Sequence, residues 1–129
     1  MSLVLLAGCG PDPDQSLVQA QDALAAGDAE ASQAAFRRGL ERHPEHLQLL
    51  LFAAGFYLEP EREEHHKPRL ALHYASRASR TDGGGAAEVD ALHIRALRAM
   101  DQHDDARALL QDALSRHPDD PNLAALRDP

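Results

Sequence analysis

The chain contains an internal repeat, and this repeat restricts the fold more than any other feature of the sequence. Residues 31–46, ASQAAFRRGLERHPEH, return as residues 105–120, DARALLQDALSRHPDD, at an offset of 74 positions. At that offset Phe36 aligns with Leu110, and Arg-His-Pro closes the pattern in both copies. A self-similar helical segment that ends in proline, and recurs at an insertion-stretched multiple of about 34 residues, is typical of a helical solenoid.

The pattern resembles the tetratricopeptide repeat, a helix pair of about 34 residues with W-x2-L-G-x2-Y in its first helix, A-x3-F in its second and a closing proline. The first copy matches it through Gly27, Ser32, Phe36, Leu40 and Pro44. The last copy matches it through Ala106, Leu110, Ala113, Leu114 and Pro118. The chain has no Trp, and its first helices depart from the pattern. The resemblance covers about residues 13–120 and implies an all-α solenoid.

The spacing predicts three helix pairs, at residues 13–46, 47–86 and 87–120. The middle unit is six residues longer than the other two, and we assign the surplus to the polar, proline-bounded stretch 59–68. We therefore expect one helical domain over residues 13–129. It is an α-solenoid of three tetratricopeptide-like pairs, in which residues 120–126 form a short C-terminal capping turn or helix.

Residues 47–58, LQLLLFAAGFYL, are apolar around nearly the whole helix, which places this helix in the middle of the stack. No alternating run rich in Val, Ile and Thr is present, so no strand is expected. In the first unit, Asp14 is the expected N-cap and Gly27 the expected C-terminal stop. The residues expected in the interior are Phe36, Leu40, Leu50, Leu110 and Leu114.

The charge of the chain bears on the class of partner. The net charge is −8 and the pI about 5.3, whereas nucleic-acid binding rewards basic surfaces with few acidic neighbours. The acidic side chains alternate with arginine along the predicted helices, as they do on a solvated surface. We therefore expect another protein or a peptide as the partner, and no nucleic acid.

The N-terminal residues resemble a bacterial lipobox, since Leu6-Ala7-Gly8 precedes Cys9, the only cysteine. The resemblance implies that Cys9 is acylated, that residues 1–12 are a signal remnant and tether, and that the protein lies on the periplasmic face of the outer membrane. A secretory signal normally has a basic start and 7–15 apolar residues, which are absent here. Either the recorded start lies inside a longer signal, or the match is accidental and the protein is cytoplasmic. Membrane attachment is expected only through lipid, because no stretch approaches about 20 apolar residues.

Catalytic and metal-binding patterns are weak. The chain has eight histidines but no H-E-x-x-H motif, and the best local cluster, His65-His66 with Glu63-Glu64, is explained more simply by a polar loop. The acidic pairs Asp104-Asp105 and Asp119-Asp120 stand at predicted helix starts, where carboxylates cap free N–H groups. We expect no catalytic residues, no metal and no cofactor, and hence no enzyme.

The tetratricopeptide resemblance also implies a binding surface, because in that family the first helix of each pair lines the concave face. The positions carried over are Leu17, Val18, Gln21, Leu51, Phe52, Gly55, Arg95 and Arg98. They form an expected apolar floor with two arginines at one end, suited to a peptide with hydrophobic residues and an acidic end. The sequence thus predicts an interaction adaptor or scaffold of the bacterial envelope. The alternatives are a cytosolic interaction module and a structural homodimer whose apolar face meets a second copy.

Overall fold

The computed structural model describes residues 12–127, and the regular secondary structure of this part of the chain is all helical. Seven α-helices and one short 3-10 helix follow one another without a strand in the described residues. Their bounds are α2 Pro13–Ala25, α3 Ala29–Arg42, α4 Leu47–Leu58, η1 Glu63–His65, α5 Pro68–Ser79, α6 Ala87–Ala99, α7 His103–Arg116 and α8 Pro121–Ala125. The predicted all-α class and three helix pairs are confirmed.

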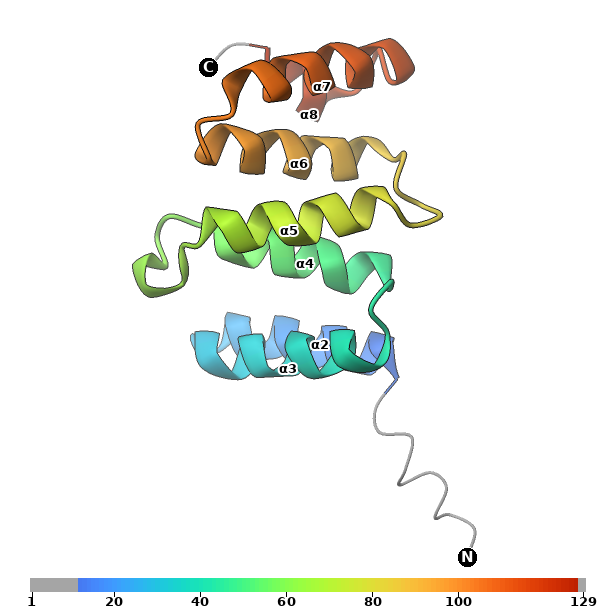
Figure 1. Ribbon diagram of the computed structural model, residues 1–129. Helices are drawn as coiled ribbons and strands as arrows, with labels where there is room; N and C mark the ends of the chain where they lie inside the picture. The colour runs from blue at the N-terminus through green and yellow to red at the C-terminus, as the bar shows by residue number, and fades with distance from the viewer. Residues whose placement is uncertain (1–11, 128–129) are drawn as a thin grey trace, which may run out of the picture.

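The helices pack as successive antiparallel pairs, α2 with α3, α4 with α5 and α6 with α7, stacked one above another (Figure 1). The first helices of the pairs also contact each other along the stack, α2 with α4, α4 with α6 and α6 with α8. No comparable contact joins α3 to α5 or α5 to α7. The side formed by α2, α4 and α6 is therefore the more tightly spaced, inner side of the stack.

Helix α4 lies at the centre of the molecule, as its all-round apolar sequence predicts. Eight of its residues are buried, and it contacts α2, α3, α5 and α6. The fully buried Phe36 of α3 packs its ring edge-on against Phe56, with the ring centroids 5.2 Å apart, and against Tyr57 at 5.8 Å. Truncation of Phe36 to alanine would cost about 3–5 kcal/mol.

The predicted interior is largely confirmed. Phe36, Leu40, Leu50 and Leu110 are buried, whereas Leu114 is only partly buried, against the smaller core cluster of α6, α7 and α8. Three alanines of α5, at every third or fourth position, are completely buried, so the helix presents a small-residue stripe to α4.

A capping side chain begins α2, and a glycine follows its end. The predicted N-cap at Asp14 is wrong: the cap is Asp12, because Pro13 already occupies the first helical position, where proline is favoured. Asp12 Oδ1 accepts a hydrogen bond from Gln15 N at 2.8 Å, and Gln15 Oε1 accepts one from Asp12 N at 3.2 Å. The C-terminal stop at Gly27 is confirmed, since its φ of 83° is a left-handed conformation that suits glycine.

The extra residues of the middle helix pair lie in the linker between its two helices, where the sequence predicts them. Residues 59–67 join α4 to α5, whereas residues 26–28 and 100–102 make the same turn in the other pairs. This linker contains η1 and is tied to the end of α4, because Lys67 N donates to Tyr57 O at 2.9 Å. The Arg62 guanidinium lies 4.9 Å from the centre of the Phe56 ring and donates to Phe56 O.

The short helix α8 closes the C-terminal end of the stack, which confirms the predicted cap. Asp120 accepts hydrogen bonds from the backbone N–H groups of Asn122 and Leu123, both at 3.0 Å, and so begins the helix. Leu123 is completely buried against the cluster that contains Ile94 and Leu97 of α6. Without α8, these two side chains would lose much of their cover.

Candidate functional site

Three of the residues expected on the inner side occupy equivalent positions in the first helices. Counted from the helix starts Pro13, Leu47 and Ala87, the ninth residue of each first helix is Gln21, Gly55 and Arg95, respectively. Gln21 and Arg95 are exposed, and Gly55 is partly exposed. A Cβ atom built at Gly55 would meet no heavy atom within 4 Å. The row therefore has polar side chains at both ends and open space in the middle.

The expected apolar floor of this surface is largely covered by the chain itself. Leu51, expected as part of this floor, is only 6% exposed and so does not face solvent. The cause is that α2 and α6 flank α4 on this side. Phe52 is partly buried, with its ring centroid 5.9 Å from that of Phe36, and Leu17 is partly buried as well. Val18, at 52%, is the only large hydrophobic residue counted as exposed among residues 12–127.

The two predicted arginines of α6 have different environments. Arg98 is partly buried, and its Nη2 donates a hydrogen bond to Leu126 O just after α8. Arg95 is exposed and forms no ion pair in the described part of the chain. Arg98 therefore holds the C-terminal cap in place, whereas Arg95 remains available to a ligand.

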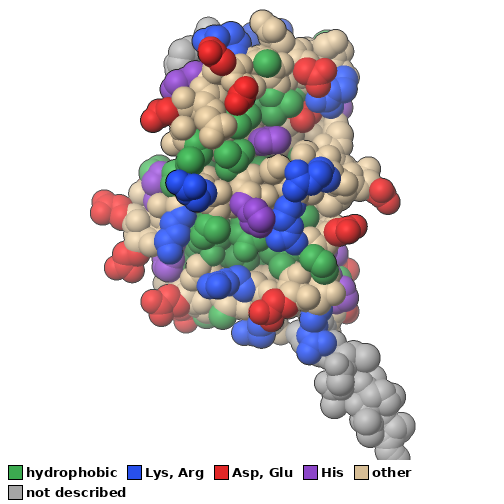
Figure 2. Space-filling view, in the orientation of Figure 1, with side chains coloured by type: hydrophobic (Ala, Val, Ile, Leu, Met, Phe, Trp, Pro, Cys, Tyr) green, Lys and Arg blue, Asp and Glu red, His purple; other side chains and the backbone are tan. Residues whose placement is uncertain are grey.

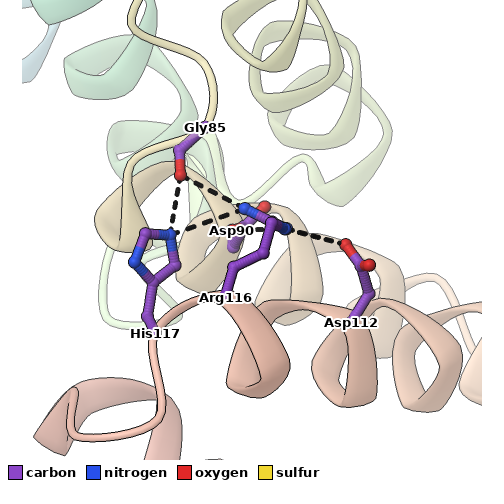
Figure 3. A network of polar contacts seen from close by, with 5 residues as sticks. All are labelled: Gly85, Asp90, Asp112, Arg116 and His117. Carbon is purple, nitrogen blue, oxygen red and sulfur yellow. Dashed lines mark hydrogen bonds and ion pairs between the residues drawn. The ribbon is translucent and has the colours of Figure 1, made fainter.

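A polar network fixes α6 against α7 (Figure 3). Arg116 of α7 donates to Asp112 at 2.8 Å and to Gly85 O at 3.2 Å, and it forms an ion pair with Asp90 of α6 at 3.0 Å. The ring of His117 lies 2.8 Å from the same Gly85 oxygen. The network thus joins the linker before α6, α6 itself and the end of α7.

The buried carboxylate of Asp90 depends on this network. Its side chain is 6% exposed, and its Oδ2 lies 3.0 Å from Arg116 Nη2, so the ion pair with Arg116 offsets its burial. The hydrogen bond to Asp112, and then the charge of Asp90, raise the pKa of Arg116 above its ordinary value. Both carboxylates therefore favour the cationic form of Arg116.

Sequence reasoning missed the role of Asp90, although the sequence carries a signal for it. Asp90 occupies the fourth position of its helix, and the equivalent residues of the other units are Ser16 and Leu50. All three positions are buried. An acid at a position that is otherwise uncharged and buried predicts a paired cation nearby, and Arg116 supplies it.

An open hollow of about 550 Å³ lies between the α2–α3 turn and the long linker. Its lining includes Asp28 and Glu30 on one side and Glu61, Glu63 and Glu64 on the other. Within residues 12–127, no three His, Cys, Asp or Glu side chains converge closely enough to hold a metal ion. The acidic lining has the composition of a solvated surface.

The expected lipidation at Cys9 lies outside the described residues. Between residues 12 and 127, no helix combines the length and the apolar character needed to cross a membrane. Of the acidic pairs predicted to cap helices, Asp120 does so, whereas Asp104 and Asp105 lie in the first turn of α7, which Gln102 precedes without a side-chain cap. Their carboxylates still favour the positive end of the helix dipole.

Comparison with known proteins gives no relative: no family model, no curated protein and no solved structure matches this chain. The helix pairs are consistent with a helical repeat.

Proposed function

We propose that this chain is a protein-interaction adaptor that binds a peptide segment of a partner protein along the inner side of α2, α4 and α6. The observation that carries the proposal is the row formed by Gln21, Gly55 and Arg95. These three equivalent positions follow one another across the stack, and the middle one has no side chain to fill the space above it.

The chemistry of the row suits a peptide with an acidic end. The exposed guanidinium of Arg95 can bind a carboxylate in a bidentate manner, and the amide of Gln21 can pair with a peptide backbone. The space over Gly55 accommodates a ligand side chain between them. The resemblance to tetratricopeptide repeats supports the same face, because the first helices of that family line the ligand groove.

We propose the bacterial envelope as the setting, with the domain attached through acylated Cys9 to the periplasmic face of the outer membrane. The support is the lipobox resemblance of residues 6–9. The alternatives are a cytosolic interaction module and a homodimer that uses the inner side on itself. Both alternatives retain the helical domain and differ only in its location or its binding partner.

The test uses a substitution that fills the space without disturbing the fold. Gly55→Arg places a long side chain where a Cβ meets nothing, and it replaces glycine by a good helix former. The matched control, Ala108→Arg, adds the same charge at an exposed position of α7. Affinity capture from an extract of the source cells, quantified by mass spectrometry, is compared for wild type and both variants.

We expect partners captured by wild type and Ala108→Arg to be lost with Gly55→Arg, while the melting temperature of Gly55→Arg does not fall. Equal recovery with all three proteins would show that the inner side is not the binding surface. Sedimentation of the purified proteins addresses the homodimer, since a dimer that uses this side would dissociate in Gly55→Arg alone.

A further inference from the structure

The segment around α5 is strongly basic within an acidic protein. Residues 65–81 contain four Lys and Arg residues and three His residues but no Asp or Glu, whereas the whole chain has a net charge of −8. The four permanent cations are Lys67, Arg69, Arg77 and Arg80. Lys67, Arg69 and Arg80 are exposed and Arg77 is partly exposed.

These cations have no acidic partner in the described part of the chain. Arg77 donates to the backbone oxygen of Pro44 at 2.6 Å, and Arg80 donates to Ser76 Oγ at 3.0 Å, but neither forms an ion pair. The arginines of α7 differ, because Arg107 pairs with Asp104 at 2.9 Å and Arg116 with Asp112 at 2.8 Å. The protein neutralises the cations of α7 internally and leaves those of α5 uncompensated.

The basic groups of α5 form a stripe. Arg69, His73 and Arg77 follow at intervals of four residues and so lie on one side of the helix, about 6 Å apart along its axis at about 1.5 Å per residue. Beside this stripe the ring of Tyr74 stacks on that of Tyr57, with the centroids 6.0 Å apart, and the Arg77 guanidinium lies 5.7 Å from the centre of the Tyr74 ring.

The stripe lies on the face formed by α3, α5 and α7, which is opposite to the inner side. In Figure 2, which shows this face, blue and purple side chains cross the middle of the molecule with hydrophobic side chains between them, and acidic side chains lie mostly toward the edges. Between α3 and α5, the ring of Phe36 contacts that of Tyr74, with the centroids 6.5 Å apart, so the exposed side of α5 rather than a groove is the surface available to a ligand.

We propose that the exposed stripe of α5 binds an acidic segment of another protein, in extended form, with carboxylates on alternate residues. Alternate side chains of an extended peptide lie on one side at intervals of about 6.6 Å, close to the spacing of the basic groups. Arginine is the side chain best suited to binding carboxylates through paired hydrogen bonds. A short acidic segment fits better than nucleic acid, because the chain as a whole has a net charge of −8, which would repel a long phosphate backbone beyond the stripe.

The probe for this surface is a fluorescein-labelled peptide of alternating Glu and Ala, about ten residues long, which spans the stripe at about 3.3 Å per residue. The comparison peptide is its Gln–Ala counterpart. Anisotropy titrations use the full chain. We expect saturable binding of the alternating Glu–Ala peptide and none of the Gln–Ala peptide. Raising NaCl from about 50 to about 300 mM should weaken the binding several-fold through screening.

Two double charge-reversal variants distinguish binding to the stripe from attraction by the net charge of the protein. Arg69→Glu with Arg80→Glu changes Arg69 of the stripe and the exposed Arg80 three residues beyond its end, and Arg107→Glu with Arg127→Glu makes the same change in net charge near the C-terminal end. We expect the first pair to lower the affinity about tenfold, which corresponds to about 1.4 kcal/mol, and the second less than twofold. Arg69→Gln alone, a milder variant, should lower it about twofold to threefold. Circular dichroism verifies that each variant is folded.

Three results would overturn the proposal. One is the absence of saturable binding to the alternating peptide at low salt. A second is an equal loss with both charge-reversal pairs, which would assign the binding to net charge. The third is binding to anionic phosphatidylserine vesicles or to an oligonucleotide without binding to the peptide, which would identify a phosphate surface. Gly55→Arg is expected to bind the alternating Glu–Ala peptide with the same affinity as wild type. Failure of the inner-side proposal and failure of this one are therefore distinguishable.

Discussion

Two helical glycines show how the space around a residue decides whether a larger side chain can replace it. A Cβ at Gly39 of α3 would lie 2.7 Å from Ser16 Cβ and 2.8 Å from Leu49 Cδ1, so α2, α3 and α4 approach each other through the missing side chain. A Cβ at Gly55 of α4 would meet nothing within 4 Å. The first glycine is required by packing, and the second is not.

The same substitution should therefore have opposite effects at the two sites. Gly39→Ala is expected to lower the free energy of unfolding by about 1–3 kcal/mol, because the contact atoms are a Cβ and a packed leucine that cannot move freely. Gly55→Ala should raise it by about 0.5–1 kcal/mol, since alanine favours the helix and loses nothing. Urea denaturation of both variants measures the two signs. A gain at Gly39, or a loss at Gly55, would contradict the packing described.

His93 makes stability depend on pH. Burial within α6 lowers the pKa of His93 below its ordinary value of 6.5, and Arg80 adds to the shift while Asp90 opposes it. The folded state then binds the proton less readily than the unfolded state does. The contribution of His93 to stability is complete above pH 6.5, and it falls as the pH drops below that value until the lower folded-state pKa is passed.

We expect the free energy of unfolding to fall more steeply with decreasing pH in wild type than in His93→Gln. Urea titrations between about pH 8 and 5 compare the two proteins, with His103→Gln, at an exposed position, as the control. Parallel pH profiles for wild type and His93→Gln would show that the ring is not desolvated enough to matter.

At the scale of the element, the sequence predicts what depends on local pattern. The repeat and its prolines give the three pairs, the all-round apolar stretch 47–58 gives the central helix with its observed bounds, and Asp120 gives the start of α8. The N-cap of α2 could also be read from the sequence, because Pro13 marks the first helical position and moves the cap to Asp12.

The candidate site was less predictable, because the exposure of its side chains depends on how neighbouring helices pack against each other. Leu51 lies one helical turn before Gly55 on α4, but its burial depends on how closely α2 and α6 approach, which no local pattern states. Likewise, the acid-free composition of residues 65–81 is visible in the sequence, whereas the absence of ion partners for its cations is visible only in the folded chain.

At the scale of the whole molecule, the proposed anchor makes a prediction about where the protein is found. Expressed in a bacterium that processes lipoproteins, the full-length gene product is expected in the membrane fraction, and Cys9→Ser should move it to the soluble fraction because the acyl acceptor is lost. Mass spectrometry of the N-terminus checks the modification directly. A wild-type product that is unmodified and soluble would favour the cytosolic alternative.

The stacked arrangement also bears on how the chain acquires its structure. Each helix contacts mainly those that precede and follow it, so few long loops must close before favourable contacts form. The larger core cluster is built mostly from α2 to α5, and the smaller one from α6 to α8. A chain emerging from the ribosome can therefore complete its larger core first and use it as a template for the rest. Until α8 arrives, Ile94 and Leu97 present an apolar edge, the feature that chaperones and quality-control proteases recognise.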